Sequence, residues 1–265
     1  MSSSTHSAPA AASRFAPGTF SPTPHPAPIA QMVWSQARTE TLLILRHGEQ
    51  LLLSIVIPVA LLIGVTYFPL ENISSPQELA LPFSLAIAAM STGFTGQAIA
   101  VVFDRRYGAL QRIGASGVPR WVIIGGKLIA VTIVSLIQAA LLITIALIIG
   151  CRTTSTAIVP MVLTILVGLI AFTSWGLFLG GTLRSEIVLA GANLIWFLLL
   201  AAAGGAAMLF GDSAPHSLLF IPSVALTQGL LAAASGTVPV FHLVIMGLWG
   251  CAGILFAVRR FRFDY

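Results

Sequence analysis

Apolar residues in this chain come in long runs, and short polar segments separate the runs. Six runs reach about 20 residues, which is the length a helix needs to cross a hydrocarbon layer of about 30 Å. We expect the fold class to be an all-α integral membrane protein with six transmembrane helices. The predicted spans are 50–68, 81–103, 121–149, 159–181, 187–210 and 238–258.

A seventh apolar run, 217–236, lies between the last two spans, but Pro222, Gln228 and Gly229 weaken it as a span. Lys and Arg stay on the cytoplasmic side of membrane proteins. Six spans with the N-terminus inside leave only Arg152 of the basic residues outside, whereas a seventh span would place the basic C-terminal end outside. The outer segment 211–237 is therefore predicted to be re-entrant or interfacial.

Two further segments complete the predicted organisation. In 29–49 the apolar positions recur every three or four residues, which favours an amphipathic helix in the headgroup plane. The alternative is that this segment extends the first span. Residues 1–28 are rich in Ser, Ala and Pro, with no apolar core of a secretory signal, and we expect a disordered cytoplasmic tail. Residues 50–258 form the six-span domain, and 259–265 a second cytoplasmic tail.

Composition agrees with the pattern. Of the 265 residues, 57% are hydrophobic and 8% are charged, whereas soluble domains carry about 25% charged residues. The basic residues cluster between spans, so we interpret the net charge of +5 as a topology signal and expect no nucleic-acid partner. The abundance of Ala, Gly and Arg suggests a bacterial source. The expected location is the bacterial cytoplasmic membrane, multi-pass, with both termini cytoplasmic.

Charge gathers at 104–120, on the inner side between the second and third spans. An ordinary basic loop is one reading. The pattern also fits a short amphipathic helix, ended by Gly114, Gly117 and Pro119. Such a helix would offer a soluble partner arginines that bind carboxylates. Its apolar side would hold Leu110, Ile113 and Val118, and its polar side Arg105, Arg106, Gln111 and Arg112.

This segment resembles the "E-x-x-x-G-T-L-x-x-L … P-V-x-R-W … G-K" segment of ABC-2 type transporter permeases, and the resemblance extends over most of the chain after residue 30. Three positions depart from the pattern: Asp104 replaces Glu, Ala109 replaces Thr, and Pro119 stands two residues late. The residues that fall in the register of this segment are Asp104, Gly108, Leu110, Arg112, Val118, Arg120, Trp121, Gly126 and Lys127.

The resemblance implies the membrane subunit of an exporter for antibiotics, lipids or polysaccharides. It implies a soluble ABC ATPase partner and a homodimer or heterodimer of permeases. ATP and Mg would bind the partner, because "IGGKL" at 124–128 lacks the first Gly and the Ser or Thr of a phosphate-binding loop. We expect no cofactor on this chain. By resemblance, the residues that couple to the ATPase would be Asp104, Arg105, Arg106, Gly108, Leu110 and Arg112, together with the 29–49 helix.

Uncharged polar residues interrupt the spans. One reading is hydrogen bonding between helices. The other is that Thr92, Thr95, Gln97 and Asn193 line a route between the second and fifth spans. The GxxxG pair Gly176 and Gly180 is expected to pack helices within one chain rather than between two.

Other classes of function are disfavoured. The spans lack deep charges, which counts against an autonomous secondary carrier or channel, and a scaffold without transport activity is a further alternative. "GASG" at 114–117 resembles the rhomboid protease motif, but Ser116 would lie across the membrane from His216 and His242. We therefore predict no catalytic residue, and the scattered histidines predict no metal site.

Overall fold

The computed structural model describes residues 27–46, 48–67, 76–151, 154–211 and 214–261, and the described residues form helices and no strand. Parts of both predicted tails, 1–28 and 259–265, therefore lie outside the described residues. In chain order, the elements are α1 Ile29–Arg46, α2 Gly48–Tyr67, α3 Pro76–Met90, η1 Ser91–Gly96, α4 Gln97–Arg106, α5 Ala109–Ala115, α6 Arg120–Ile148, η2 Ser155–Ala157, α7 Ile158–Thr182, α8 Ser185–Phe210, η3 Leu218–Phe220, α9 Pro222–Ala234 and α10 Val240–Arg260.

Five stretches of helix are long and apolar enough to cross a membrane, and they coincide with the second to sixth predicted spans. They are 76–106, 120–148, 158–182, 185–210 and 240–260. The first predicted span coincides with α2, whose stretch Ser54–Tyr67 is a shorter apolar helix. The predicted all-α membrane class is confirmed.

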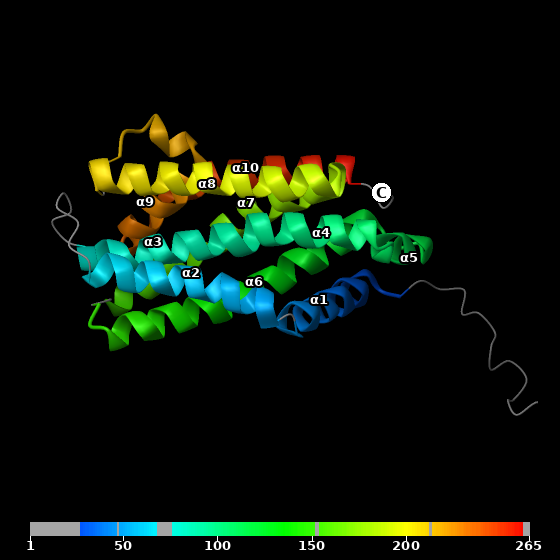
Figure 1. Ribbon diagram of the computed structural model, residues 1–265, viewed down its shortest axis with the longest axis horizontal. Coiled ribbons are helices and arrows are strands. Elements are labelled where there is room, and N and C mark those ends of the chain that lie inside the picture. The colour runs from blue at the N-terminus through cyan, green and yellow to red at the C-terminus, as the bar shows by residue number, and fades with distance from the viewer. Residues whose placement is uncertain (1–26, 47, 68–75, 152–153, 212–213, 262–265) are drawn as a thin grey trace, which may run out of the picture.

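One continuous helix, formed by α3, η1 and α4, lies at the centre of the molecule. It contacts α2, α6, α7, α8 and α9 (Figure 1). In η1 the backbone bonds follow a π-helical pattern, a rare form that often marks functional sites. This π-helical turn covers "STGFTG", the polar stretch of the second predicted span. The chain therefore changes its helical geometry where its sequence is richest in small and polar residues.

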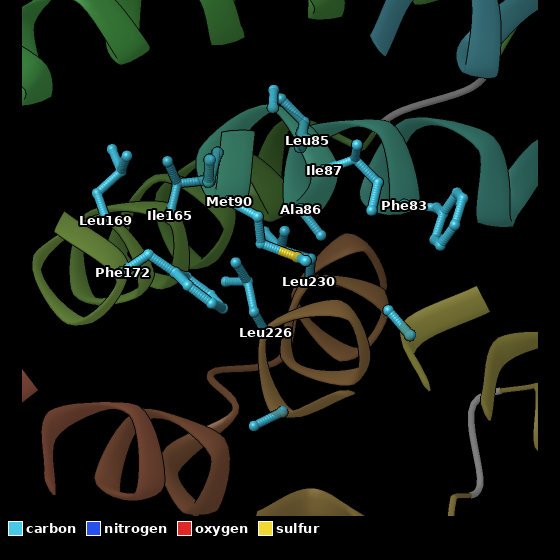
Figure 2. Packing of buried hydrophobic residues seen from close by; sticks show 14 of the residues in the cluster. Phe83, Leu85, Ala86, Ile87, Met90, Ile165, Leu169, Phe172, Leu226 and Leu230 are labelled. Atoms are coloured by element: carbon cyan, nitrogen blue, oxygen red, sulfur yellow. The ribbon is translucent and has the colours of Figure 1, made fainter. Parts of the chain in front are cut away.

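The helix α9 is short and enclosed. Its 13 residues span about 20 Å, which is too short to cross the hydrocarbon layer. It packs against α3, α7, α8 and α10. Figure 2 shows Leu226 and Leu230 of α9 beside Met90 of α3 and Phe172 of α7, at the heart of the core. Of the two predicted forms of segment 217–236, this enclosed helix fits the re-entrant one.

Close backbone contact joins α7 to the central helix. A Cβ on Gly176 would lie 2.5 Å from the carbonyl oxygen of Phe94, and one on Gly180 would collide with the carbonyl oxygen of Ala98. Glycine is required at both positions because no side chain fits there. The prediction that this GxxxG pair packs helices within one chain is confirmed.

Several connections and the end of the described chain meet at one end of the bundle, which we call the α5 end. Figure 1 shows α5, part of α1 and the last turn of α10 there. Phe261 packs against Gly181 at the end of α7. The end of α7 and the end of α10 therefore lie side by side at the α5 end. The basic residues of the elements and connections that meet there include Arg105, Arg106, Arg112, Arg120, Lys127, Arg184, Arg259 and Arg260.

The outward faces of the long helices are apolar. Leu194, Phe197, Leu198 and Leu209 of α8 are exposed, as is Leu248 of α10. Water would solvate such a surface poorly, whereas lipid chains or another apolar helix would cover it at no cost. The exposed faces of the bundle therefore suit a bilayer.

Candidate functional site

The helix α5 forms the tip of the segment 104–120. Gly108 has a φ of 72° and turns the chain sharply between α4 and α5, and Gly117 has a φ of 77° after α5. Only glycine adopts this left-handed conformation readily. Pro119 then precedes α6. The predicted short helix is therefore present, with its ends set by the two left-handed glycines.

An apolar anchor and a polar outer side give α5 its orientation. Leu110 is 1% exposed and packs in a small cluster with Val101, Ile123 and Leu177. Gln111 and Arg112, on the other side of α5, are exposed. Arg106 and Tyr107, just before α5, are exposed as well, and the Arg106 Nη1 atom donates to the Ser185 hydroxyl at 3.4 Å. This amphipathic division follows the prediction, except at one position.

Arg105 is the exception, because it is buried rather than part of the polar side. Its Nη1 atom donates to the carbonyl oxygens of Gly180 at 2.9 Å and Leu183 at 2.8 Å. It lies four residues after Val101 in a continuous helix, which places both on the buried face of α4. Arg105 thus bonds the carbonyl groups that the end of α7 leaves unpaired, and it is not on the surface open to a partner.

Asp104 and Lys127 form part of an ion cluster that the sequence did not reveal. The Lys127 Nζ atom lies 2.8 Å from Asp104 Oδ2 and 2.8 Å from Glu40 Oε1. The Lys127 side chain is 1% exposed, against 12% for Glu40 and 36% for Asp104. The third predicted span, 121–149, already contained Lys127, and in the structure α6 begins at Arg120, so that Lys127 lies two turns inside the helix. The "G-K" pair of the family resemblance was the available signal.

The helix α1 lies along the first half of α6. At Gly126 a Cβ would lie 2.7 Å from Gln36 Cβ and 3.2 Å from the Ala37 backbone nitrogen. Because Gly126 has no side chain, α1 can approach α6 closely. Gln36 in turn donates to Glu40 Oε1 at 2.8 Å. Residues 29–46 of the segment 29–49 form the helix α1, which is held against α6 by packing and by a hydrogen-bonded carboxylate.

A pocket of about 550 Å³ opens between α1 and α5. Polar groups on its walls include Gln31 and Ser35 of α1 and Arg112 of α5. Apolar side chains line the rest, including Met32, Ile113 and Val122. The pocket joins the two segments that the sequence marked as contacts for a soluble partner. We call the exposed surface of α1, α5 and this pocket the α1–α5 surface.

The predicted route residues do not share one surface within the chain. The Thr92 hydroxyl donates to Gln138 Oε1 at 3.0 Å, and the Gln138 amide donates to the Ser54 carbonyl oxygen. Gln97 is buried, and the buried Thr95 hydroxyl has no hydrogen-bond partner among the described residues. Asn193 instead lies on the exposed side of α8, where it donates to the Leu189 carbonyl oxygen at 2.8 Å. A route that includes Asn193 would need a second chain.

Ser116 lies far from the two histidines that the sequence analysis compared with it. Ser116 is exposed beside α5 and donates to the Ile113 carbonyl oxygen. His216 and His242 lie near Phe241, at the start of α10. The described residues contain no group of three or more His, Cys, Asp or Glu side chains that could hold a metal ion.

Fold and surface together define a multi-pass helical membrane protein with a charged, partly hollowed surface at one end. The comparisons with known proteins identify its family. Residues 31–227 match the model of the ABC-2 type transporter, so the chain belongs to this family and is the membrane permease subunit of an ABC transporter. No curated protein matches the chain.

Proposed function

We propose that this permease subunit belongs to an ATP-driven exporter, and that the α1–α5 surface is where a soluble ABC ATPase subunit docks. The observation that carries the proposal is the pocket between α1 and α5, with the exposed guanidinium of Arg112 on its wall. Arginine pairs well with carboxylates of a partner in a forked geometry. ATP and Mg bind the ATPase subunit, and this chain holds no cofactor.

Charge supports the orientation of the proposed complex. The basic residues that gather at the α5 end mark this end as cytoplasmic by the positive-inside rule. Both termini are then cytoplasmic, and the protein lies in the cytoplasmic membrane of a bacterium. An ATPase that uses cytoplasmic ATP would meet the α1–α5 surface there.

The exposed faces of the helices support a dimer and an amphiphilic substrate. Asn193 places an amide among the exposed apolar side chains of α8, where lipid offers no partner for its remaining donor and its side-chain oxygen. A second permease, identical or related, would cover this face. Between two such faces, an apolar route with a few polar groups suits drug-like, antibiotic or lipid-like molecules.

The first prediction concerns the docking surface. Arg106→Glu with Arg112→Glu reverses two exposed charges at α5 and should abolish co-purification of an ATPase in mild detergent, because carboxylates of the partner would then meet like charges. Arg259→Glu with Arg260→Glu makes the same change in net charge on α10, also at the α5 end, and should retain the partner. The readout is the identity of the bound protein and the ATPase activity of the eluate.

Two other outcomes would count against the proposal. If both double variants retain the ATPase equally, the α1–α5 surface is not the docking site. If no ATPase accompanies the native chain even after crosslinking in membranes, an autonomous carrier or channel becomes the better reading. Export is tested in inside-out vesicles, where ATP should drive substrate into the lumen; movement in the opposite direction would contradict it.

A further inference from the structure

A buried lysine connects three helices beside the proposed docking surface. Lys127 belongs to α6, Glu40 to α1 and Asp104 to the last turn of α4, and both carboxylates contact the same ammonium group at 2.8 Å. Removing a lysine from water carries a large penalty, which a well-placed carboxylate offsets. An exposed lysine at this end of α6 would satisfy the positive-inside rule equally well. The burial of Lys127 therefore needs another explanation.

Each neighbour of Lys127 is itself fixed to a different part of the molecule. Glu40 accepts a hydrogen bond from Gln36, which packs over Gly126. Asp104 is followed directly by Arg105, whose guanidinium is bonded to the end of α7, and it lies four residues before Gly108, the residue that precedes α5. The Lys127 ammonium therefore joins α1 directly to the last turn of α4, which continues through the bend at Gly108 into α5.

We infer that Lys127 is a positioning residue that makes α1 and α5 move as one body when the partner pushes on them. This inference rests on the proposed function, since it assumes that a partner acts on the α1–α5 surface. Without the ion cluster, α5 would be joined to the bundle by the apolar packing of Leu110 and Ile113 and by its chain connections to α4 and α6, and α1 by its packing on α6. A push on α5 would then leave α1 behind.

The two contacts of Lys127 differ in how easily they open. Glu40 is enclosed, with 12% of its side chain exposed, so the loss of its partner would leave a carboxylate without water. Asp104 is 36% exposed, and water can solvate it when it separates from Lys127. The Asp104 contact is thus the one that a variant can remove without exposing a buried charge.

The test compares Asp104→Asn, which removes the charge, with Asp104→Glu, which keeps a carboxylate and is the residue usual at this position in the resembled family. Both are made after Cys151 and Cys251 are replaced by Ser. Spin labels at Thr39→Cys of α1 and Ala115→Cys of α5, both exposed positions, report the distance between the two helices. A second pair, Ala115→Cys and Ile187→Cys, relates α5 to the exposed side of α8.

Distances are measured in nanodiscs, first without a partner and then with the ATPase subunit and ATP. In the native background and in Asp104→Glu, we expect one narrow α1–α5 distance that ATP does not change, while the α5–α8 distance shifts. In Asp104→Asn, we expect the α1–α5 distribution to broaden without a partner, and to shift with ATP.

Two results would overturn the inference: an Asp104→Asn distribution that matches the native one in both conditions, or a native α1–α5 distance that ATP changes. The measurement without a partner tests the ionic link between α1 and α5 independently of the ATPase. If no ATPase binds the native chain, the proposed function fails, yet a broadened distribution in Asp104→Asn still supports the ionic link between α1 and α5. The two failures are therefore distinguishable.

Discussion

At the scale of single residues, charge and small size act together at the α5 end. Lys127 carries a charge on the buried face of α6. The neighbouring Gly126 has no side chain, so α1 can approach and its Glu40 carboxylate can reach that charge. Hydropathy assigns a lysine near the start of a span to the membrane surface, since it weighs residue types without their partners. The burial of Lys127 depends on its ion pair with Glu40, which lies 87 positions earlier in the chain. No local sequence pattern reveals that these two residues are partners.

The glycine beside Lys127 gives a prediction with a matched control. Gly126→Ala should lower stability by about 1–3 kcal/mol, the usual range for overpacking, because the new Cβ would meet Gln36 and the α1 backbone. At Gly125 an added Cβ would find Val33 at 3.8 Å, which is ordinary contact, so Gly125→Ala should be neutral or slightly stabilising. Thermal unfolding in one detergent compares the variants, and equal midpoints would contradict this account.

At the scale of elements, the sequence located helices well and their surroundings poorly. Five of the six predicted spans are helices long enough to cross a membrane, because a run of about 20 apolar residues is seldom found outside membrane helices. The run that became α9 looked like an outer segment, and its deep enclosure by four helices could not be read from composition. Arg105 was misplaced because the polar side of α5 was extended across the bend at Gly108, although α4 has its own buried face.

The contact between α7 and α4 is the element-scale feature easiest to test. Gly180→Ala should destabilise the fold by about 1–3 kcal/mol, because its Cβ would meet the backbone of Ala98, which cannot rotate away. Gly247→Ala on α10 is the control, since nothing lies within 4 Å of its added Cβ. The ratio of monodisperse to aggregated protein after mild heating gives the readout; a stable Gly180→Ala variant would show that α7 can move away from α4 cheaply.

At the scale of the whole molecule, the two ends of the bundle differ in chemistry. The α5 end carries arginines, a buried ion cluster and the α1–α5 surface, whereas the loop before α9 bears Ser217 and His216. The positive-inside rule, applied to the sequence, anticipated this separation because it counts charges between spans. It could not show which charges stay exposed, since that depends on helix faces and on packing.

Orientation in the membrane is the prediction that belongs to this scale. In a cysteine-free background, Ser217→Cys should react with a membrane-impermeant maleimide on intact cells, because it is exposed at the end opposite α5. Ser116→Cys, exposed beside α5, should react only after the cells are permeabilised. The reverse labelling pattern would show that the proposed topology is inverted. Labelling of both cysteines on intact cells would contradict a fold that places them on opposite sides of the membrane.

The π-helical turn η1 has a consequence for the far end of the same helix. A π turn holds one residue more than an α-helical turn, and each residue of an α-helix rotates the following side chains by about 100°. The turn at Ser91–Gly96 therefore sets the angular phase of everything after it, including Asp104 toward α6 and Arg105 toward α7. A one-residue deletion within η1 would swing both charges away from their partners while leaving every residue of the α5 end unchanged.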